Sequence, residues 1–164
     1  QYQKGNYEEA RRELMKCPDD CYEKYYWLGV IDLIEGRQDD AIKQLETLLE
    51  AGDTGIYFST VRAMHCAWEG KLEDGKRILK EAFSSSLQLG SYHFFIAAEV
   101  YAQLGDADSA IQMLGKAAES GYSNYPFLIS DPMLAPVREG KGFAQVAKSM
   151  QTLQTQLQLM LVTG

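Results

Sequence analysis

The chain has 164 residues, of which 16 are Lys or Arg and 23 are Asp or Glu, so its formal net charge is −7. This length fits one compact unit, and 46% apolar with 24% charged residues is typical of a folded globular chain. The acidic balance argues against nucleic-acid binding, which needs a basic surface to neutralise phosphates. No apolar stretch approaches the ~20 residues that span a bilayer, so we expect no membrane insertion and a cytoplasmic location.

The first residues, Gln1-Tyr2-Gln3, open inside a motif, which indicates a domain excised from a larger protein. Three cysteines are too few for a disulfide scaffold, and their count is odd. A zinc site built from Cys17, Cys21, His65 and Cys66 is the alternative, but the spacing matches no common zinc motif. We therefore predict structural thiols, with neither a metal nor a cofactor.

Four segments of the chain repeat one pattern. Each has a glycine, a small residue five places later and a leucine four places after that. The glycines are separated by 31, 34 and 35 residues. The three sets are Gly5, Gly36, Gly70 and Gly105; Ala10, Ala41, Gly75 and Ala110; and Leu14, Leu45, Leu79 and Leu114.

Each repeat predicts a hairpin of two helices, because apolar residues recur at helical spacing on both sides of the glycine. The glycine is expected to end the first helix in the left-handed conformation, and the Asp, Gln or Asn after it to cap the second. Small residues allow the paired helices to approach closely: Gly29, Ala63 and Ala98 on the first helices, and Ala41, Gly75 and Ala110 on the second.

This pattern resembles the tetratricopeptide repeat, a helix–turn–helix unit of 34 residues. The strongest match is 22–55, with Tyr25, Leu28-Gly29 and Gly36; 56–90 is degenerate, and 91–124 recovers Phe94 and Ala98. Residues 1–21 match half a repeat. The resemblance implies an all-α, right-handed superhelical solenoid that forms a single domain over 1–164.

Residues 125–142 contain three of the four prolines and predict an ordered, rigid connector. The run Tyr125-Pro126-Phe127-Leu128, followed by Asp131-Pro132, resembles a segment that closes such arrays in bacterial multidomain signalling proteins. That resemblance implies a regulatory parent protein. A C-terminal helix is predicted over 143–162.

By the same resemblance, the first helices of the repeats line a concave groove. Most of the residues at its slots are aromatic or apolar, which are residue types that anchor interfaces. The slots fall on Tyr26, Val30, Tyr57, Thr60, Met64, Trp68, Tyr92, Phe95 and Glu99. Core packing of these aromatic residues is the alternative, since aromatics at helical spacing also build cores.

The predicted last helix carries an apolar seam at three- and four-residue spacing: Phe143, Val146, Met150, Leu153, Leu157 and Met160. The net charge is −9 over 1–139 and +2 beyond. The first half of the seam is expected to cap the last repeat. The second half, with Leu153, Leu157 and Met160, is expected to contact a second copy or an adjoining domain.

An enzyme is the least favoured function, because candidates for nucleophilic chemistry are few, with His65, Cys66 and His93 the set considered, and no phosphate-binding loop is present. The sequence predicts a non-enzymatic module that binds an apolar or helical segment of a partner protein or peptide in the groove. The alternative is an oligomerisation or regulatory domain, in which the tail helix fills the groove or pairs two copies.

Overall fold

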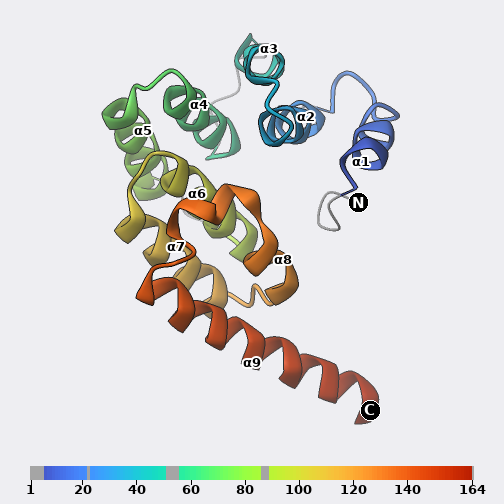
Figure 1. The fold of residues 1–164 in the computed structure, drawn as a ribbon, viewed down its shortest axis with the longest axis vertical. Helices are drawn as coiled ribbons and strands as arrows, with labels where there is room; N and C mark the ends of the chain where they lie inside the picture. The colour runs from blue at the N-terminus through green and yellow to red at the C-terminus, as the bar shows by residue number, and fades with distance from the viewer. Residues whose placement is uncertain (1–5, 22, 51–55, 86–88, 164) are drawn as a thin grey trace. The chain divides into compact units, whose positions relative to one another are not determined.

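A computed structural model describes residues 6–21, 23–50, 56–85 and 89–163. Every regular element in these ranges is a helix, so the predicted all-α class is confirmed there (Figure 1). The α-helices, with one 3-10 helix, η2, are α1 (Tyr7–Leu14), α2 (Glu23–Ile34), α3 (Gln38–Glu50), α4 (Ile56–Trp68), α5 (Leu72–Ser85), α6 (Ser91–Gln103), α7 (Ala107–Glu119), α8 (Tyr125–Ser130), η2 (Pro132–Val137) and α9 (Lys141–Thr163).

The chain divides into two compact units, Gln1–Ile78 and Leu79–Gly164, with the division inside α5. Each unit contains one hairpin whose two helices pack along each other: α2 with α3 in the first, and α6 with α7 in the second. The organisation of 1–164 as one domain stays a prediction. None of the helices in the described ranges is both long enough and apolar enough to cross a membrane.

The predicted glycine turns are present after α2, α4 and α6. Gly36, Gly70 and Gly105 have φ angles of 75°, 76° and 69°, the left-handed region that only glycine enters without strain. In each turn the residue after the glycine donates its N–H to the carbonyl five places earlier, which closes the helix end. For Arg37 this acceptor is the Asp32 carbonyl, at 2.8 Å. Gly5, the first glycine of the pattern, lies outside the described residues.

The α2–α3 hairpin is closely packed at Gly29, as the pattern predicts. A β-carbon on Gly29 would lie 3.4 Å from the Ala41 carbonyl and 3.5 Å from a methyl group of Leu45. Ala41, Leu45 and Leu48 of α3 are buried. Larger side chains at the small positions would therefore separate the two helices.

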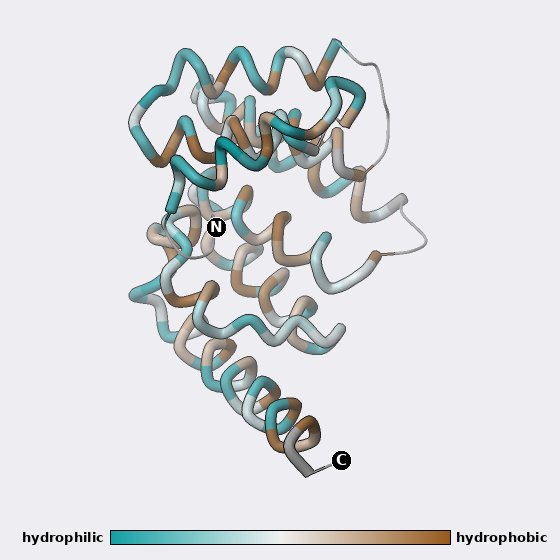
Figure 2. The backbone as a smooth tube through the Cα atoms, turned by 90° about the vertical axis from the view of Figure 1, so that its right-hand side faces the viewer, coloured by the Kyte–Doolittle hydropathy of each residue, from teal (hydrophilic) through white to brown (hydrophobic). Residues whose placement is uncertain are grey.

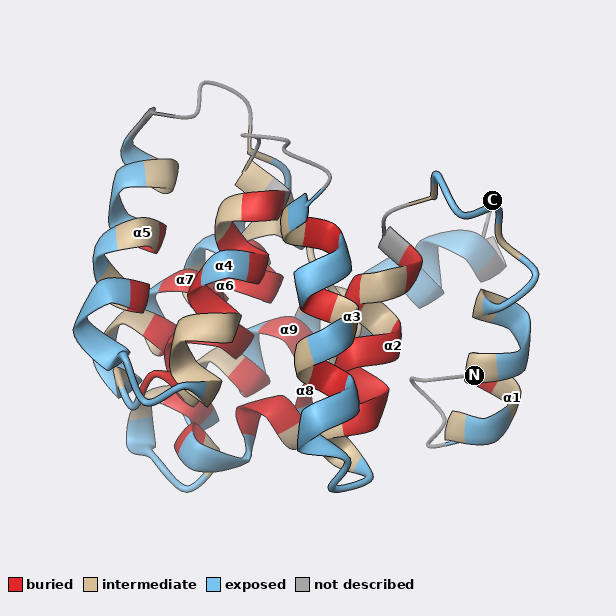
Figure 3. Cartoon of the chain, turned by 90° about the horizontal axis from the view of Figure 1, so that it is seen from above, coloured by how far each residue is buried: buried red, intermediate tan, exposed pale blue. Residues whose placement is uncertain are grey.

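In the second unit, α6 is the central helix. Eight consecutive residues of α6, Phe95 to Ala102, are buried, and buried residues, red in Figure 3, are seen along α6. Asp106 begins α7 by accepting a hydrogen bond from the Ser109 N–H at 3.0 Å, as expected for the residue after the turn glycine.

The predicted connector 125–142 is built from α8 and η2. Asn124 caps α8 through the Phe127 N–H, and Asp131 caps η2 through the Met133 N–H at 2.9 Å. The side chain of Gln103 donates to the Met133 carbonyl at 2.7 Å, which holds η2 against α6. The connector is thus ordered, as predicted, and contains two short helices.

Helix α9 begins at Lys141, two residues before the predicted start, and packs against α7 and α8. Phe143, Ala147 and Met150 are buried, so the first half of α9 covers the neighbouring helices as a cap. The second half extends beyond α7 and α8 within this unit, and hydrophobic residues recur along it to its last turns (Figures 1 and 2).

Candidate functional site

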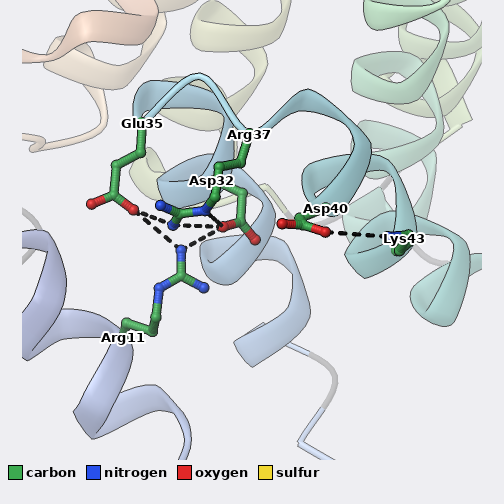
Figure 4. Close-up of polar contacts among 6 residues, drawn as sticks. All are labelled: Arg11, Asp32, Glu35, Arg37, Asp40 and Lys43. Carbon is green, nitrogen blue, oxygen red and sulfur yellow. Dashed lines mark hydrogen bonds and ion pairs between the residues drawn. The ribbon is translucent and has the colours of Figure 1, made fainter.

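In the first unit, a network of ion pairs joins α1 to α2 and to the turn after it (Figure 4). Asp32, only 1% exposed, accepts hydrogen bonds at Oδ1 from Arg11 Nη2 at 2.5 Å and from Arg37 Nε at 2.9 Å. Both guanidinium groups also pair with Glu35. The hydrogen bonds from Arg37 to Asp32 and Glu35 raise the pKa of Arg37. A buried carboxylate requires such partners, so the network fixes α1 onto α2.

A polar cleft of about 470 Å³ opens beside this network. Its lining alternates carboxylates with cationic groups: Glu8, Arg11, Asp32, Glu35, Arg37, Asp40, Lys43 and Gln44. Lys43 pairs with Asp40 at 3.2 Å on α3. Because the charges of the cleft are largely paired with each other, its geometry favours a structural role over ligand binding.

In the second unit, an apolar groove of about 490 Å³ lies between α7 and α9. We call it the α7–α9 groove, and it is lined by Ile111, Gly115, Ala118 and Glu119 of α7 and by Gly142, Gln145, Val146, Ser149 and Leu153 of α9. The two helices approach closely at Gly142, where a β-carbon would lie 2.8 Å from Cγ2 of Ile111. At Gly115, by contrast, a β-carbon would meet no atom within 4 Å, so the groove is open there.

The end of α9 carries exposed apolar side chains next to this groove. Leu157, Met160 and Leu161, which are 41%, 67% and 85% exposed, form a stripe along one side, and Leu159, 60% exposed, lies on the other side of the helix. The seam predicted from the sequence is therefore buried at Phe143 and Met150 and exposed at Leu157 and Met160. We call residues 154–163 the distal end of α9. An exposed apolar stripe of this kind is a feature of interaction surfaces.

Six of the nine residues predicted to line a concave groove are buried: Tyr26, Val30, Thr60, Met64, Phe95 and Glu99. Phe95, for example, stacks on Tyr122 with 4.3 Å between the ring centroids. The burial of Tyr122 raises the pKa of its hydroxyl group. These six residues take the packing role that was the alternative in the sequence. Trp68 is half-buried and Tyr92 is 43% exposed, so the predicted lining is reduced to these two; the Tyr57 side chain lies outside the described residues.

The two histidines considered for catalysis or metal binding have local partners. His65 Nδ1 lies 3.2 Å from Glu69 on the next turn of α4, and His93 Nδ1 accepts from the Gly90 N–H at 3.1 Å. Burial raises the pKa of the Cys66 thiol, which disfavours the nucleophilic thiolate. Over the described residues, no three His, Cys, Asp or Glu side chains gather where they could hold a metal ion.

Two features were missed in the sequence. Asp32 occupies the position held by Cys66 and Tyr101 in the following repeats, so a charged residue in a packing slot was the available signal for the ion-pair network. The α7–α9 groove had a weaker signal, a glycine in the middle of a helix at Gly115. Comparisons with protein-family models, with curated proteins and with solved structures found no match.

Proposed function

We propose that this chain is a non-enzymatic protein–protein interaction module whose contact surface is the distal end of α9 together with the α7–α9 groove. The observation that carries the proposal is the exposure of Leu157, Met160 and Leu161 on one helix end. Apolar side chains of this size are unfavourable in water. A partner that covers them contributes about 25 cal/mol of favourable free energy for each Å² of apolar surface that it buries.

The repeated hairpins support this class of function. We propose that they belong to the tetratricopeptide type and form a right-handed superhelix, as in a regulatory region of a larger signalling protein. The partner surface then lies at the capped end of the array, because the predicted concave lining is mostly buried. A groove lined by Ile111, Val146 and Leu153 suits an apolar helical segment.

Site-specific photo-cross-linking tests the surface. A photoreactive amino acid at position 160, on the exposed stripe, is expected to form covalent adducts with a protein in an extract of the source cells. The matched control places the same group at Thr155, which is exposed on the opposite side of α9. The Leu157→Gln change, which keeps the helix and removes the apolar side chain, should abolish the adduct at position 160.

Adducts that form equally from positions 155 and 160, or that survive Leu157→Gln, would show that the apolar stripe does not recruit the partner. An absence of adducts from position 160 would contradict the proposed surface.

A further inference from the structure

We infer that the partner of this surface is a second copy of the chain, with the distal end of each α9 seated in the α7–α9 groove of the other copy. This inference rests on the proposed function and names the partner of the same site. It is carried by four properties of α9 and α7: the face, the length, the shape and the charge of the two surfaces.

The groove and the exposed stripe lie on the same face of α9. From α9 the groove is lined by Gly142, Val146, Ser149 and Leu153, at steps of four, three and four residues. Leu157 and Met160 continue this series at steps of four and three. Residues at such steps lie above one another on a helix, so Leu153 ends the groove and begins the exposed stripe.

The two surfaces also have the same length. The helix rises about 1.5 Å per residue, so the groove from Gly142 to Leu153 extends roughly 16 Å and the stretch from Leu153 to Thr163 roughly 15 Å. Two antiparallel α9 helices related by a two-fold axis near Leu153 therefore place the distal end of each helix over the groove of the other copy. One contact then covers both apolar surfaces of both copies, as in a closed isologous dimer.

The shape of the groove admits a helix. Gly115 and Ala118 on α7, with Gly142 and Ser149 on α9, are small residues along its walls. Small side chains at a helix contact allow the axes to approach toward the short end of the usual 8–10 Å range. Ile111 and Val146 supply the apolar floor against which Leu157 and Met160 of the second copy would pack.

Charge favours a second copy over a partner of other composition. The chain carries −7 overall, yet α9 has no charged side chain after Lys148, and Glu119 is the one charged residue among those lining the groove. Two copies therefore meet along a neutral strip, which adds no charge repulsion at the contact itself. A basic or acidic helix would find no complementary row of charges there.

The mass of the 164-residue chain in solution, measured by light scattering over a concentration series, tests the inference. The unchanged chain is expected to have twice the mass of one copy. Gly115→Glu is expected to halve that mass, because it puts a charged side chain into the open part of the groove, where its β-carbon would meet no atom within 4 Å. Gly115→Ala is the matched control and should remain dimeric.

Two further variants test the same contact between copies from the side of α9. Leu157→Gln with Met160→Gln should also give single copies that still unfold cooperatively. Leu153→Cys should cross-link to itself under oxidation, in a background where Cys17, Cys21 and Cys66 are serine, because Leu153 lies next to the proposed two-fold axis.

Two results would overturn the inference: a single-copy mass for the unchanged chain at every concentration, or a dimer that persists in both Gly115→Glu and the double glutamine variant. If the chain is a single copy but position 160 still cross-links to another protein, the interaction module stands and its partner is not a second copy. If position 160 also forms no adduct, the proposed function fails too.

Discussion

Arg11 of α1 donates a 2.5 Å hydrogen bond to the carboxylate of Asp32, a buried residue of α2 that lies 21 positions further along the chain. Ala10 is the one buried residue of α1 among those the structure describes. With so little apolar burial, the attachment of α1 depends on this ion pair more than on packing.

Arg11→Ala should therefore lower the free energy of unfolding by about 1–2 kcal/mol, since the buried Asp32 carboxylate loses a charged donor while it retains Arg37. Urea denaturation measures the change. The neighbouring Arg12 is exposed, and Arg12→Ala should change the same quantity by less than about 0.5 kcal/mol. Equal effects of the two substitutions would show that the ion pair does not hold α1.

The pair formed by Asp19 and Lys24 makes a prediction about pH. Lys24 Nζ donates to Asp19 at 2.5 Å and to the Cys17 carbonyl at 3.1 Å. The hydrogen bond and the charge of Lys24 lower the pKa of Asp19 below its ordinary value of about 3.9. A lowered folded-state pKa means that the stabilisation is fully present above about pH 4 and is lost as the pH falls through the lower value.

Lys24→Met should return the pKa of Asp19 to its ordinary range in an NMR titration of the carboxyl group. Lys16→Met removes another ammonium group, one that pairs with Glu13, and should leave the titration of Asp19 unchanged. A lowered pKa of Asp19 that persists in Lys24→Met would rule out Lys24 as its cause.

The parts of the fold that sequence reasoning predicted correctly are those that depend on local chemistry. A turn glycine such as Gly105 follows from the need for a positive φ where one helix ends, and the Asp106 cap depends on residues three positions apart. Both features depend on residues that are only a few positions apart in the sequence, so the repeat pattern was enough to predict them.

The parts that were not predicted depend on contacts between distant residues. Phe95 and Tyr92 lie three positions apart at similar predicted slots, yet Phe95 is buried against Tyr122 and Tyr92 is exposed. Helical spacing places residues on a face but does not state what covers that face. The pairing of Arg11 with Asp32 could not be predicted from the sequence for the same reason.

Two glycines ten residues apart should respond in opposite directions to the same substitution. Gly105→Ala should destabilise the chain by about 1 kcal/mol, because φ is 69° there and a β-carbon disfavours the left-handed region. Gly115→Ala should stabilise it by up to about 1 kcal/mol, because alanine has the higher helix propensity. Neither β-carbon would meet an atom within 4 Å, so steric clashes do not contribute to the difference between the two substitutions. Urea midpoints that shift in the same direction would contradict the assigned conformations.

The close approach of α9 to α7 is tested at Gly142. Its β-carbon would lie 2.8 Å from Cγ2 of Ile111, a distance at which one helix must move, so Gly142→Ala should destabilise the second unit by about 1–3 kcal/mol despite the better helix propensity of alanine. Ile111→Ala removes the clashing methyl group. In a double-mutant cycle followed by thermal unfolding, the cost of Gly142→Ala should therefore fall to near zero, or reverse, when residue 111 is alanine. Additive effects of the two substitutions would mean that Gly142 and Ile111 do not determine how closely α9 packs on α7.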